Sequence, residues 1–316
     1  MIIPMSVSRP AGPQAERLAD MTWFLTWLCT AVAVIVIATM FYALWRGRRR
    51  TENASGTDVE RGIARWVGGG VIATAVILIV ILLQNLATGR ALAAFADPSA
   101  MTIRVIAQQW WWAVEYRDPL PSRRLTTANE IHVPVGRRIR IEVESRDVVH
   151  SFWAPNAHGK IDVVPGYSAS TYIQLDKPGR YHGRCAEFCG LQHAHMDFFI
   201  IAQEPAEFAK WYESQLRPAT NPADTLQMRG REIFLSKQCA MCHAIRGTPA
   251  DSRIGPDLTH IASRSTLAAG KIPNTRGHLA GWIMDPQSIK PGVFMPPNQM
   301  RSDELQALLS YLESLK

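Results

Sequence analysis

The chain has 316 residues, a formal net charge of +7 and 47% hydrophobic residues. This length is sufficient for two or three domains. A large part of the positive charge lies in one short segment, residues 46–65, so the basic balance does not indicate a nucleic-acid-binding surface.

Two stretches near the N-terminus, residues 21–45 and 66–89, contain no charged residue. A hydrocarbon core of about 30 Å requires roughly 20 apolar residues in a helix, so each stretch is long enough to span a membrane. The first stretch is too long for a cleaved signal peptide, and no small-residue cleavage site follows it. Tryptophans lie near the ends of both stretches, where interfacial aromatic residues are expected: Trp23, Trp27, Trp45 and Trp66. The sequence therefore predicts two transmembrane helices rather than two buried helices of a soluble core.

The segment between these stretches is rich in arginine, which places it in the cytoplasm by the positive-inside rule. Its arginines are Arg46, Arg48, Arg49, Arg50, Arg61 and Arg65. Both termini and everything after Arg90 are then expected outside. Neither stretch contains a histidine, aspartate or glutamate, and Glu60 beside the second stretch is interpreted as a solvated charge. We therefore expect the helices to anchor the chain and the outer region to carry the chemistry.

The outer region begins with β-structure, from residue 101 to about residue 203. The segments "TIRVIAQQWWWAVEY", "NEIHVPVGRRIRIEVES" and "ASTYIQLDKPGRYHGRC" alternate apolar and polar residues and are separated by Pro and Gly. Short strands at this spacing predict a sandwich or barrel. A helix is expected at "EPAEFAKWYESQL", and the proline-containing stretch "RPATNPAD" follows it.

From residue 225 onward the pattern is helical. The last segment, "SDELQALLSYLESLK", predicts an amphipathic helix with Ser302 as its N-cap and acidic residues in its first turn. The expected organisation is an outer segment at 1–20, a two-helix transmembrane hairpin at 21–90 and an all-β domain at 91–213. A linker at 214–224 and an all-α domain at 225–316 complete it.

The all-α domain contains "CAMCH", residues 239–243, which has the C-x-x-C-H pattern of covalent haem attachment. Two thiols bind the haem vinyl groups, and His243 is held beneath the iron. A disulfide, a redox pair or half of a zinc site would be alternatives, but the last 73 residues lack a second cysteine pair for zinc. Met295 in "FMPPNQM" is the expected sixth ligand, with Met300 as the second candidate; a Met/His pair suits electron transfer.

The all-β domain contains "CAEFCGLQHAHM", residues 185–196, which crowds soft and borderline metal ligands into one loop. Cys185, Cys189, His193 and Met196 together favour copper, because zinc rarely uses a thioether. His150 in "DVVHSFWAP" is the expected upstream ligand. A structural zinc ion or a Cys185–Cys189 disulfide would be the alternatives. Blue-copper sites use one cysteine, so two cysteines suggest two copper ions bridged by two thiolates.

This loop, with the upstream "HSFWAP", the "GKIDVVPG" turn and the two apolar stretches, resembles cytochrome c oxidase subunit II over residues 15–213. That family has the motif C-x-E-x-C-x3-H-x2-M for a binuclear copper centre, CuA. The resemblance implies a cupredoxin-like sandwich and a magnesium or manganese ion bound by the Glu187 side chain at the subunit I interface. It implies these copper ligands: His150, Cys185, the Glu187 carbonyl, Cys189, His193 and Met196. His195 falls outside the motif.

The all-α domain resembles class I cytochrome c in "GREIFLSKQCAMCH", "GPDLT", "MPP" and the final helix. In that family the first and last helices cross at a glycine and an aromatic residue, which implies Gly230 or Phe234 and Tyr311. The carbonyl of Pro256 is expected to contact His243. The whole chain thus resembles subunit II with a C-terminally fused class I cytochrome c, as in caa-type haem–copper oxidases.

The aromatic run "QQWWWAVEY" matches a third feature of the subunit II family. Core packing and an interfacial belt are the structural interpretation of the three tryptophans. The resemblance adds that the first of them, Trp110, accepts electrons from cytochrome c. Residues 101–204 contain twelve Lys and Arg against eleven Asp and Glu, whereas many such domains are acidic, so the external donor stays open.

These resemblances imply the electron-accepting subunit of a proton-pumping haem–copper oxidase that reduces oxygen to water. Electrons would pass from a c-type cytochrome through haem c and CuA to subunit I, with subunit III as a further partner and no nucleic acid. The expected location is a bacterial inner membrane, crossed twice, with both outer domains in the periplasm. The alternatives are the small subunit of a CuA-containing nitric oxide reductase and a membrane-anchored electron carrier without enzymatic activity.

Overall fold

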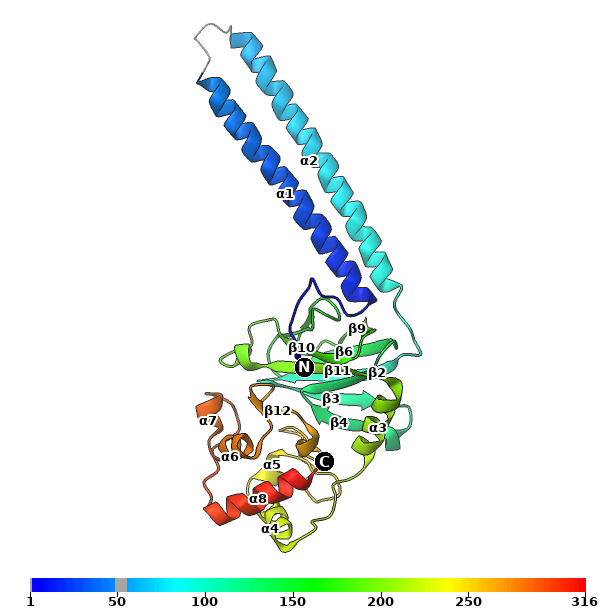
Figure 1. Ribbon diagram of the computed structural model, residues 1–316, viewed down its shortest axis with the longest axis vertical. Helices are drawn as coiled ribbons and strands as arrows, with labels where there is room; N and C mark the ends of the chain where they lie inside the picture. The colour runs from blue at the N-terminus through cyan, green and yellow to red at the C-terminus, as the bar shows by residue number, and fades with distance from the viewer. Residues whose placement is uncertain (1, 49–55) are drawn as a thin grey trace. The chain divides into compact units, whose positions relative to one another are not determined.

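A computed structural model describes residues 2–48 and 56–316 (Figure 1). Arg49 and Arg50, two of the arginines used for the topology prediction, lie outside the described residues. The chain divides into two compact units, and each is described by itself. One comprises residues 16–96, and the other comprises residues 1–15 and 97–316.

Two long apolar helices form the unit at residues 16–96: α1 (Pro13–Gly47), whose first turn precedes the unit, and α2 (Gly56–Ala93). They run side by side in Figure 1. Pro13 suits a first helical turn, where its missing N–H would have no partner. Both helices extend beyond the uncharged stretches at 21–45 and 66–89, and both are long and apolar enough to cross a membrane. Their most apolar windows contain no buried residue in the described chain, as expected for helices that face lipid rather than a protein core.

Residues 97–203 form a sandwich of two β-sheets, as predicted. One sheet has the order β4 (Leu125–Ala128), β3 (Trp111–Arg117), β2 (Met101–Gln108), β6 (Ile139–Ser145) and β9 (Ala169–Ile173). The other has the order β5 (Glu130–Pro134), β11 (Asp197–Gln203), β10 (Gly179–Cys185), β7 (His150–Trp153) and β8 (Ile161–Val163). The short strand β1 (Ile2–Ile3) pairs in parallel with β10. Sequence analysis missed β1, because two isoleucines carry no periodicity.

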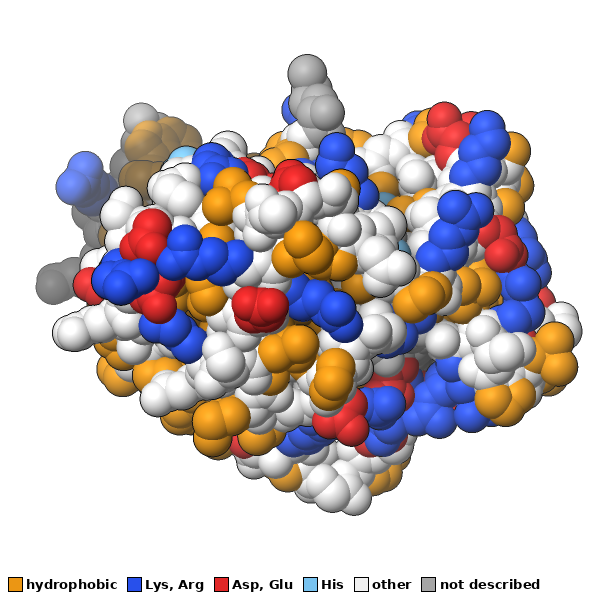
Figure 2. Space-filling view, turned by 90° about the horizontal axis from the view of Figure 1, so that it is seen from below, with side chains coloured by type: hydrophobic (Ala, Val, Ile, Leu, Met, Phe, Trp, Pro, Cys, Tyr) orange, Lys and Arg blue, Asp and Glu red, His pale blue; other side chains and the backbone are white. Residues whose placement is uncertain are grey.

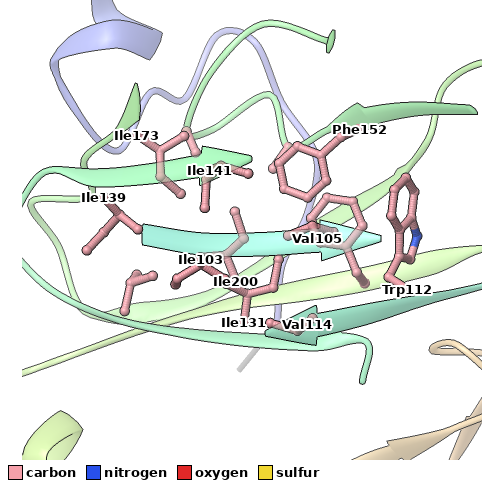
Figure 3. Close-up of a cluster of buried hydrophobic side chains, with 14 of the residues drawn as sticks. Ile103, Val105, Trp112, Val114, Ile131, Ile139, Ile141, Phe152, Ile173 and Ile200 are labelled. Carbon is pink, nitrogen blue, oxygen red and sulfur yellow. The ribbon is translucent and has the colours of Figure 1, made fainter. Parts of the chain in front are cut away.

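The core of the sandwich is built from alternate strand positions, since successive side chains of a strand point to opposite faces. Ile103 and Val105 of β2 are fully buried, and they lie in register with Ile141 and Val143 of β6. Figure 3 shows these rows meeting Ile200 of β11 between the two sheets. At one end of the core, Trp112 makes edge contacts with Phe152 and Phe198. The alternation read from the sequence therefore corresponds to one continuous core.

Helix α3 (Pro205–Leu216) closes the sandwich and ends later than the predicted domain boundary. Phe208 and Tyr212 are buried, and the Tyr212 hydroxyl donates to the carbonyl of Arg123 at 2.7 Å. Because α3 continues to Leu216, residues 214–216 are helical, although a linker was expected to begin at 214.

The rest of the chain is mainly helical. Its helices are α4 (Thr225–Ser236), α5 (Cys239–Cys242), α6 (Arg276–Met284), α7 (Pro286–Ile289) and α8 (Ser302–Ser314). A small ladder joins β12 (Thr266–Leu267) to β13 (Ile272–Pro273), and a 3-10 turn lies at η3 (Ile261–Ser263). Two further 3-10 turns, η1 (Pro121–Arg123) and η2 (His193–His195), lie in the β-sandwich. Helix α8 begins at Ser302, so its N-cap is Arg301 rather than Ser302; the Arg301 amide donates to the Glu304 carboxylate at 3.0 Å.

Helices α4 and α8 cross at the residues that the resemblance implied. A Cβ added at Gly230 would lie 2.0 Å from the carbonyl oxygen of Ala307, so only glycine permits this approach. The rings of Phe234 and Tyr311 meet edge to face one turn away, with centroids 6.4 Å apart. The predicted crossing is therefore confirmed.

Candidate metal and haem sites

The sandwich brings His150 and the cysteine loop together through strand pairing. His150 begins β7, Cys185 ends β10, and the two strands are antiparallel neighbours with Cys185 opposite Phe152. The loop after Cys185 returns to β10, where the Cys185 amide donates to the carbonyl of Met196 at 3.0 Å. A histidine 35 residues upstream is thus placed beside the loop by the sheet register.

Each potential ligand atom at this loop lies within van der Waals distance of at least one other. The two sulfur atoms of Cys185 and Cys189 are 3.8 Å apart, far beyond the roughly 2.05 Å of a disulfide bond. The Nδ1 atom of His150 lies 3.8 Å from the Cys185 sulfur, and Nδ1 of His193 lies 3.7 Å from the Cys189 sulfur. The Met196 sulfur is 3.8 Å from that of Cys189. All side chains expected at a copper site therefore converge, and both cysteines are free thiols.

The spacing of these atoms suits more than one metal ion. A metal ion about 2.3 Å from both sulfurs would make an S–metal–S angle of about 110°, close to tetrahedral. His150, Cys185 and Cys189 offer ligand atoms that all lie within 4.8 Å of one another, but His193 is not a member of this set. One ion with ligands at about 2.0–2.3 Å would not reach both histidines and both sulfurs. Two ions that share the two sulfurs would reach all four.

Asp147 fixes the orientation of His150, and sequence analysis missed this residue. Its Oδ1 atom lies 2.8 Å from Nε2 of His150, which leaves Nδ1 directed at the Cys185 sulfur. Ligating histidines commonly bond a carboxylate through the other ring nitrogen in this way. Burial alone would lower the pKa of His150, but the bonds to Cys185 and Asp147 outweigh it and raise that pKa. The signal in the sequence was an acidic residue three positions before the histidine.

The two thiols share charge unequally. The hydrogen bond with Cys189, together with contacts from His150 and two backbone groups, lowers the pKa of Cys185 against the effect of burial. The same thiol–thiol bond and burial raise the pKa of Cys189. Without metal, thiolate character is therefore greater at Cys185, and a proton is held more tightly at Cys189. Metal binding by both sulfurs would release that proton, so it would be favoured at higher pH.

Glu187 lies between the two cysteines and offers two kinds of oxygen. Its carbonyl oxygen is 3.2 Å from the Cys185 sulfur, and the residue as a whole is exposed. The carbonyl thus points into the loop while the carboxylate is accessible from outside. This arrangement fits a backbone ligand with a separate, outward-facing acidic group.

In the helical region, the C-x-x-C-H segment and its following loop hold His243 by two contacts. The His243 amide donates to the carbonyl of Cys239 at 3.0 Å, and its Nδ1 lies 2.7 Å from the carbonyl of Pro256, as predicted. A Cβ added at Gly255 would lie 2.6 Å from the imidazole ring, so the ring occupies space that only glycine leaves. Burial lowers the pKa of His243, partly offset by the Pro256 carbonyl. A neutral imidazole with Nε2 available is the form that binds iron.

The donor atoms of this segment suit a covalently bound haem. Cys239 and Cys242 are free thiols at intermediate burial, and Gly255 leaves room for the His243 ring. An open cavity of about 580 Å³ lies next to α5, with Ala240, Met241, Pro297 and Asn298 among its lining residues. Neither the two cysteines nor His243 line this cavity, so the donor set carries the fit to haem.

The candidate sixth ligands differ in their surroundings. Met295 lies in an irregular stretch two residues before the cavity lining, and its carbonyl accepts from the Gln287 amide at 3.1 Å. Met300 packs against the hydrophobic core of the helices. Both ring nitrogens of His260 contact backbone carbonyls, those of Lys316 and Arg217, at 2.8 and 3.1 Å. These contacts make His260 structural. Neither methionine lines the cavity, so Met295 stays the candidate that the sequence predicts.

The three tryptophans of the aromatic run have different roles. Trp112 is fully buried in the sandwich core and Trp111 is partly exposed, which bears out core packing for at least one of them. Trp110 is 6% exposed, and its indole N–H donates to the carbonyl of Cys189 at 2.9 Å. Trp112 also reaches the loop, since its indole N–H donates to the carbonyl of Met196 at 3.4 Å, so both Trp110 and Trp112 contact the cysteine loop. His195 contacts Gln192 and Lys271 instead of a ligand position.

Two family models match the outer region. Residues 101–203 match the periplasmic domain of cytochrome c oxidase subunit II, and residues 227–316 match cytochrome c. Cytochrome c oxidase subunit 2 of Alkalihalophilus pseudofirmus is 35% identical over 315 residues, covering 97% of this chain and 90% of that protein. The chain belongs to the cytochrome c oxidase subunit 2 family. The subunit 2 of Bacillus subtilis is 29% identical, over 99% of this chain and 92% of that protein.

A solved structure resembles the copper domain of this family member. The periplasmic domain of subunit II of cytochrome oxidase from Bradyrhizobium japonicum is 33% identical and covers 38% of this chain and 96% of that one, with a TM-score of 0.36. Together with the two family models, the apolar helices, the two packed sheets and the terminal helices bear out the predicted fold: two apolar helices, a cupredoxin-like β-domain and a cytochrome c region. As a cytochrome c oxidase subunit 2, the chain is part of a haem–copper oxidoreductase, and its two outer domains imply copper and haem c.

Charges of both signs are mixed on the face of the molecule seen in Figure 2. Lys and Arg side chains are interspersed there with Asp and Glu, and several basic groups gather at the right of the view.

Proposed function

We propose that this subunit receives electrons from a c-type cytochrome and passes them, through its own haem and then its copper centre, to haem in subunit I, where oxygen is reduced to water. Convergence of two thiols, two imidazoles and a thioether beside a haem-attachment segment of the same chain is the observation that carries this proposal. Bound copper and haem c would each supply reversible one-electron transfer, and the chain's residues would hold them in place.

The proposed ligands of a binuclear copper centre are the six groups at the cysteine loop: His150, Cys185, the Glu187 carbonyl, Cys189, His193 and Met196. Two observations support two ions over one. The sulfurs of Cys185 and Cys189 lie close together, and His193 does not belong to the compact set of donors formed by His150 and the two cysteines. Asp147 orients His150, and binding of metal by both sulfurs would release the proton that the two thiols retain.

The proposed haem ligands are Cys239 and Cys242 for covalent attachment, with His243 and Met295 as axial groups. Pro256 orients the imidazole, and Gly255 leaves room for its ring. Met295 is proposed over Met300 because Met300 packs against the hydrophobic core of the helices. A pair of Met and His axial ligands would raise the reduction potential and leave no open coordination position on the iron, which suits electron transfer.

Two further roles belong to the same proposal. The exposed Glu187 carboxylate is a proposed ligand for magnesium or manganese at the subunit I interface. Trp110, bonded to the Cys189 carbonyl, is the proposed residue through which electrons reach the copper. Subunits I and III are the expected partners, and a bacterial inner membrane crossed by α1 and α2, with both redox domains in the periplasm, is the expected location.

Purified oxidase containing this chain tests the proposal through its metal content, spectra and turnover. We expect a low-spin haem c spectrum, a mixed-valence two-copper EPR signal and consumption of oxygen with reduced cytochrome c. A haem c spectrum without the two-copper signal would remove the copper assignment. Turnover of nitric oxide in place of oxygen would replace the oxidase by a reductase, and purification without any large haem-containing subunit would leave only an electron carrier.

A further inference from the structure

Trp110 is covered by a loop of the cytochrome domain, residues 290–294. The ring of Phe294 stacks on the Trp110 indole, with centroids 5.7 Å apart and an angle of 18° between the planes. Phe294 itself is 73% exposed, whereas Trp110 is 6% exposed. Trp110, which contacts the copper loop, is therefore occupied by the chain's own cytochrome domain.

Lys290 holds this loop in place with a buried, hydrogen-bonded side chain. Its side chain is 3% exposed, and its Nζ donates to the carbonyls of Trp110 at 3.0 Å and Ala268 at 3.3 Å. Burying an ammonium group is unfavourable unless it is well bonded, and burial lowers the pKa of Lys290 to about 8. The lysine thus connects the backbone of Trp110 to two segments of the cytochrome domain at once.

The same loop contacts the copper loop directly. The Gln192 side-chain amide, one residue before the proposed ligand His193, donates to the carbonyl of Pro291 at 2.8 Å. Gly292 has a φ of +87°, and a Cβ added there would lie 2.8 Å from Cδ1 of Leu191. Residues 290–294 therefore sit on both Trp110 and the stretch that holds His193.

Phe294 also precedes Met295, the proposed iron ligand, in the sequence. A short series of contacts thus runs from Met295 through the stacked rings of Phe294 and Trp110 to the carbonyl of Cys189. A soluble donor approaching Trp110 would first have to displace the 290–294 loop together with the Lys290 contacts.

We infer that Phe294 and Lys290 are positioning residues that hold the haem domain on Trp110, so that this tryptophan receives electrons from the chain's own haem and not from a soluble cytochrome. The inference rests on the proposed function. In the step, the ferrous haem loses one electron and the oxidised copper pair gains it; no covalent bond or proton is transferred. A soluble donor then has to reduce the haem first.

The test compares Phe294→Leu with Phe294→Tyr in the intact oxidase. Leucine keeps an apolar side chain but removes the ring, whereas tyrosine keeps the ring. Both variants should fold, because Phe294 is exposed and surface substitutions change stability little. The rate of electron transfer from photoreduced haem c to CuA is measured optically. We expect Phe294→Leu to be severalfold slower than wild type and Phe294→Tyr to be close to it. Leu226→Ala, at another exposed apolar residue of the same domain, should leave the rate unchanged.

Equal rates in Phe294→Leu, Phe294→Tyr and wild type would overturn the inference while leaving the proposed function intact. Absence of haem-to-copper transfer in the wild-type oxidase would instead overturn the proposed function.

A second variant reports on the contact without electron transfer. Lys290→Met removes the ammonium group but keeps an unbranched apolar chain. We expect faster amide hydrogen exchange in residues 109–112 and 290–294, together with slower haem-to-copper transfer. Exchange and transfer rates both equal to those of the wild type would contradict the anchoring role of Lys290.

Discussion

The copper loop and the haem segment are both built from cysteine, histidine and methionine, but the fold prepares them to different degrees. At the copper loop, strand pairing between β7 and β10 already places His150 beside Cys185, and the ligand atom of every proposed side chain lies within 3.8 Å of another. At the haem segment, the contact with Pro256 fixes His243, whereas Met295 lies in an irregular stretch of the chain.

This difference reflects the size of what each site holds. Metal ions fill the space between side chains that already touch, so a β-sandwich with its own core can form the copper site. A haem is a large part of the core of a small helical domain, so that domain is completed by the group it binds. We therefore expect loss of copper and loss of haem to have very different structural consequences.

The largest expected effect is on the stability of the cytochrome domain without haem. In the double variant Cys239→Ala/Cys242→Ala, haem attachment should be lost, and α4 and α8 should lose protection from hydrogen exchange because a bound group no longer stabilises them. In Cys185→Ala, the two-copper EPR signal should disappear while the haem bands and the protection of β2 and β6 persist. Cys29→Ala, at an exposed and distant cysteine, serves as the control. Equal loss of protection in both domains would contradict the comparison.

Gly255→Ala should disturb the haem site without touching the haem ligands. The new methyl group would overlap the His243 ring, since its Cβ would lie 2.6 Å from that ring. Overpacking of this kind typically lowers the free energy of unfolding by about 1–3 kcal/mol, and the haem reduction potential should shift as His243 moves. Gly277→Ala, where a Cβ meets nothing within 4 Å, is the matched control and should leave both quantities unchanged. Identical unfolding curves and potentials for the two variants would show that Gly255 does not set the position of His243.

Replacing the candidate axial methionines one at a time distinguishes them. Met295→Leu should lower the haem reduction potential markedly, because the thioether that raises it is lost. Met300→Leu should keep the potential and cost less than about 1.5 kcal/mol of stability, as expected for a volume-conserving change beside a core. A potential that falls in Met300→Leu and not in Met295→Leu would reverse the assignment.

The smallest expected effect concerns His132, which stacks on Trp211 with ring centroids 3.9 Å apart, outside both redox sites. Burial lowers the pKa of His132, partly offset by its bond to Gln203, so the folded state keeps the imidazole neutral while the unfolded chain titrates near 6.5. Its contribution to stability is complete above about pH 6.5 and is lost as the pH falls below that value. Thermal unfolding of the oxidase between pH 7.5 and about 5 should show a shallower pH dependence for His132→Gln than for wild type. If the two proteins showed the same pH dependence of thermal unfolding, His132 would not contribute to the pH dependence of stability.

Much of this architecture could be predicted from the sequence because the signals are local or periodic. The uncharged stretches, the alternation in β2 and β6 and the C-x-x-C-H segment each depend on neighbouring residues alone. The ligand set at the copper loop came from a motif, and His150 was linked to it through a resemblance.

The features that could not be predicted depend on contacts formed only in the folded chain. Asp147 becomes a partner of His150 only because the turn before β7 folds its carboxylate back onto the ring. Lys290 and Phe294 lie about 180 residues beyond Trp110, and no periodicity connects a proline- and glycine-containing loop to a tryptophan on another domain. Strand β1 is likewise fixed by its pairing with β10 and not by its own two residues.

The central claim is that one chain holds a haem and a copper centre in series. It is tested most directly by reducing haem c with a light pulse in the intact oxidase and following haem c and CuA at the same time. The account predicts that reoxidation of haem c and reduction of CuA proceed with one shared rate constant and equal numbers of electrons. Reoxidation of haem c without matching reduction of CuA, or reduction of CuA by a soluble donor while haem c stays oxidised, would contradict it.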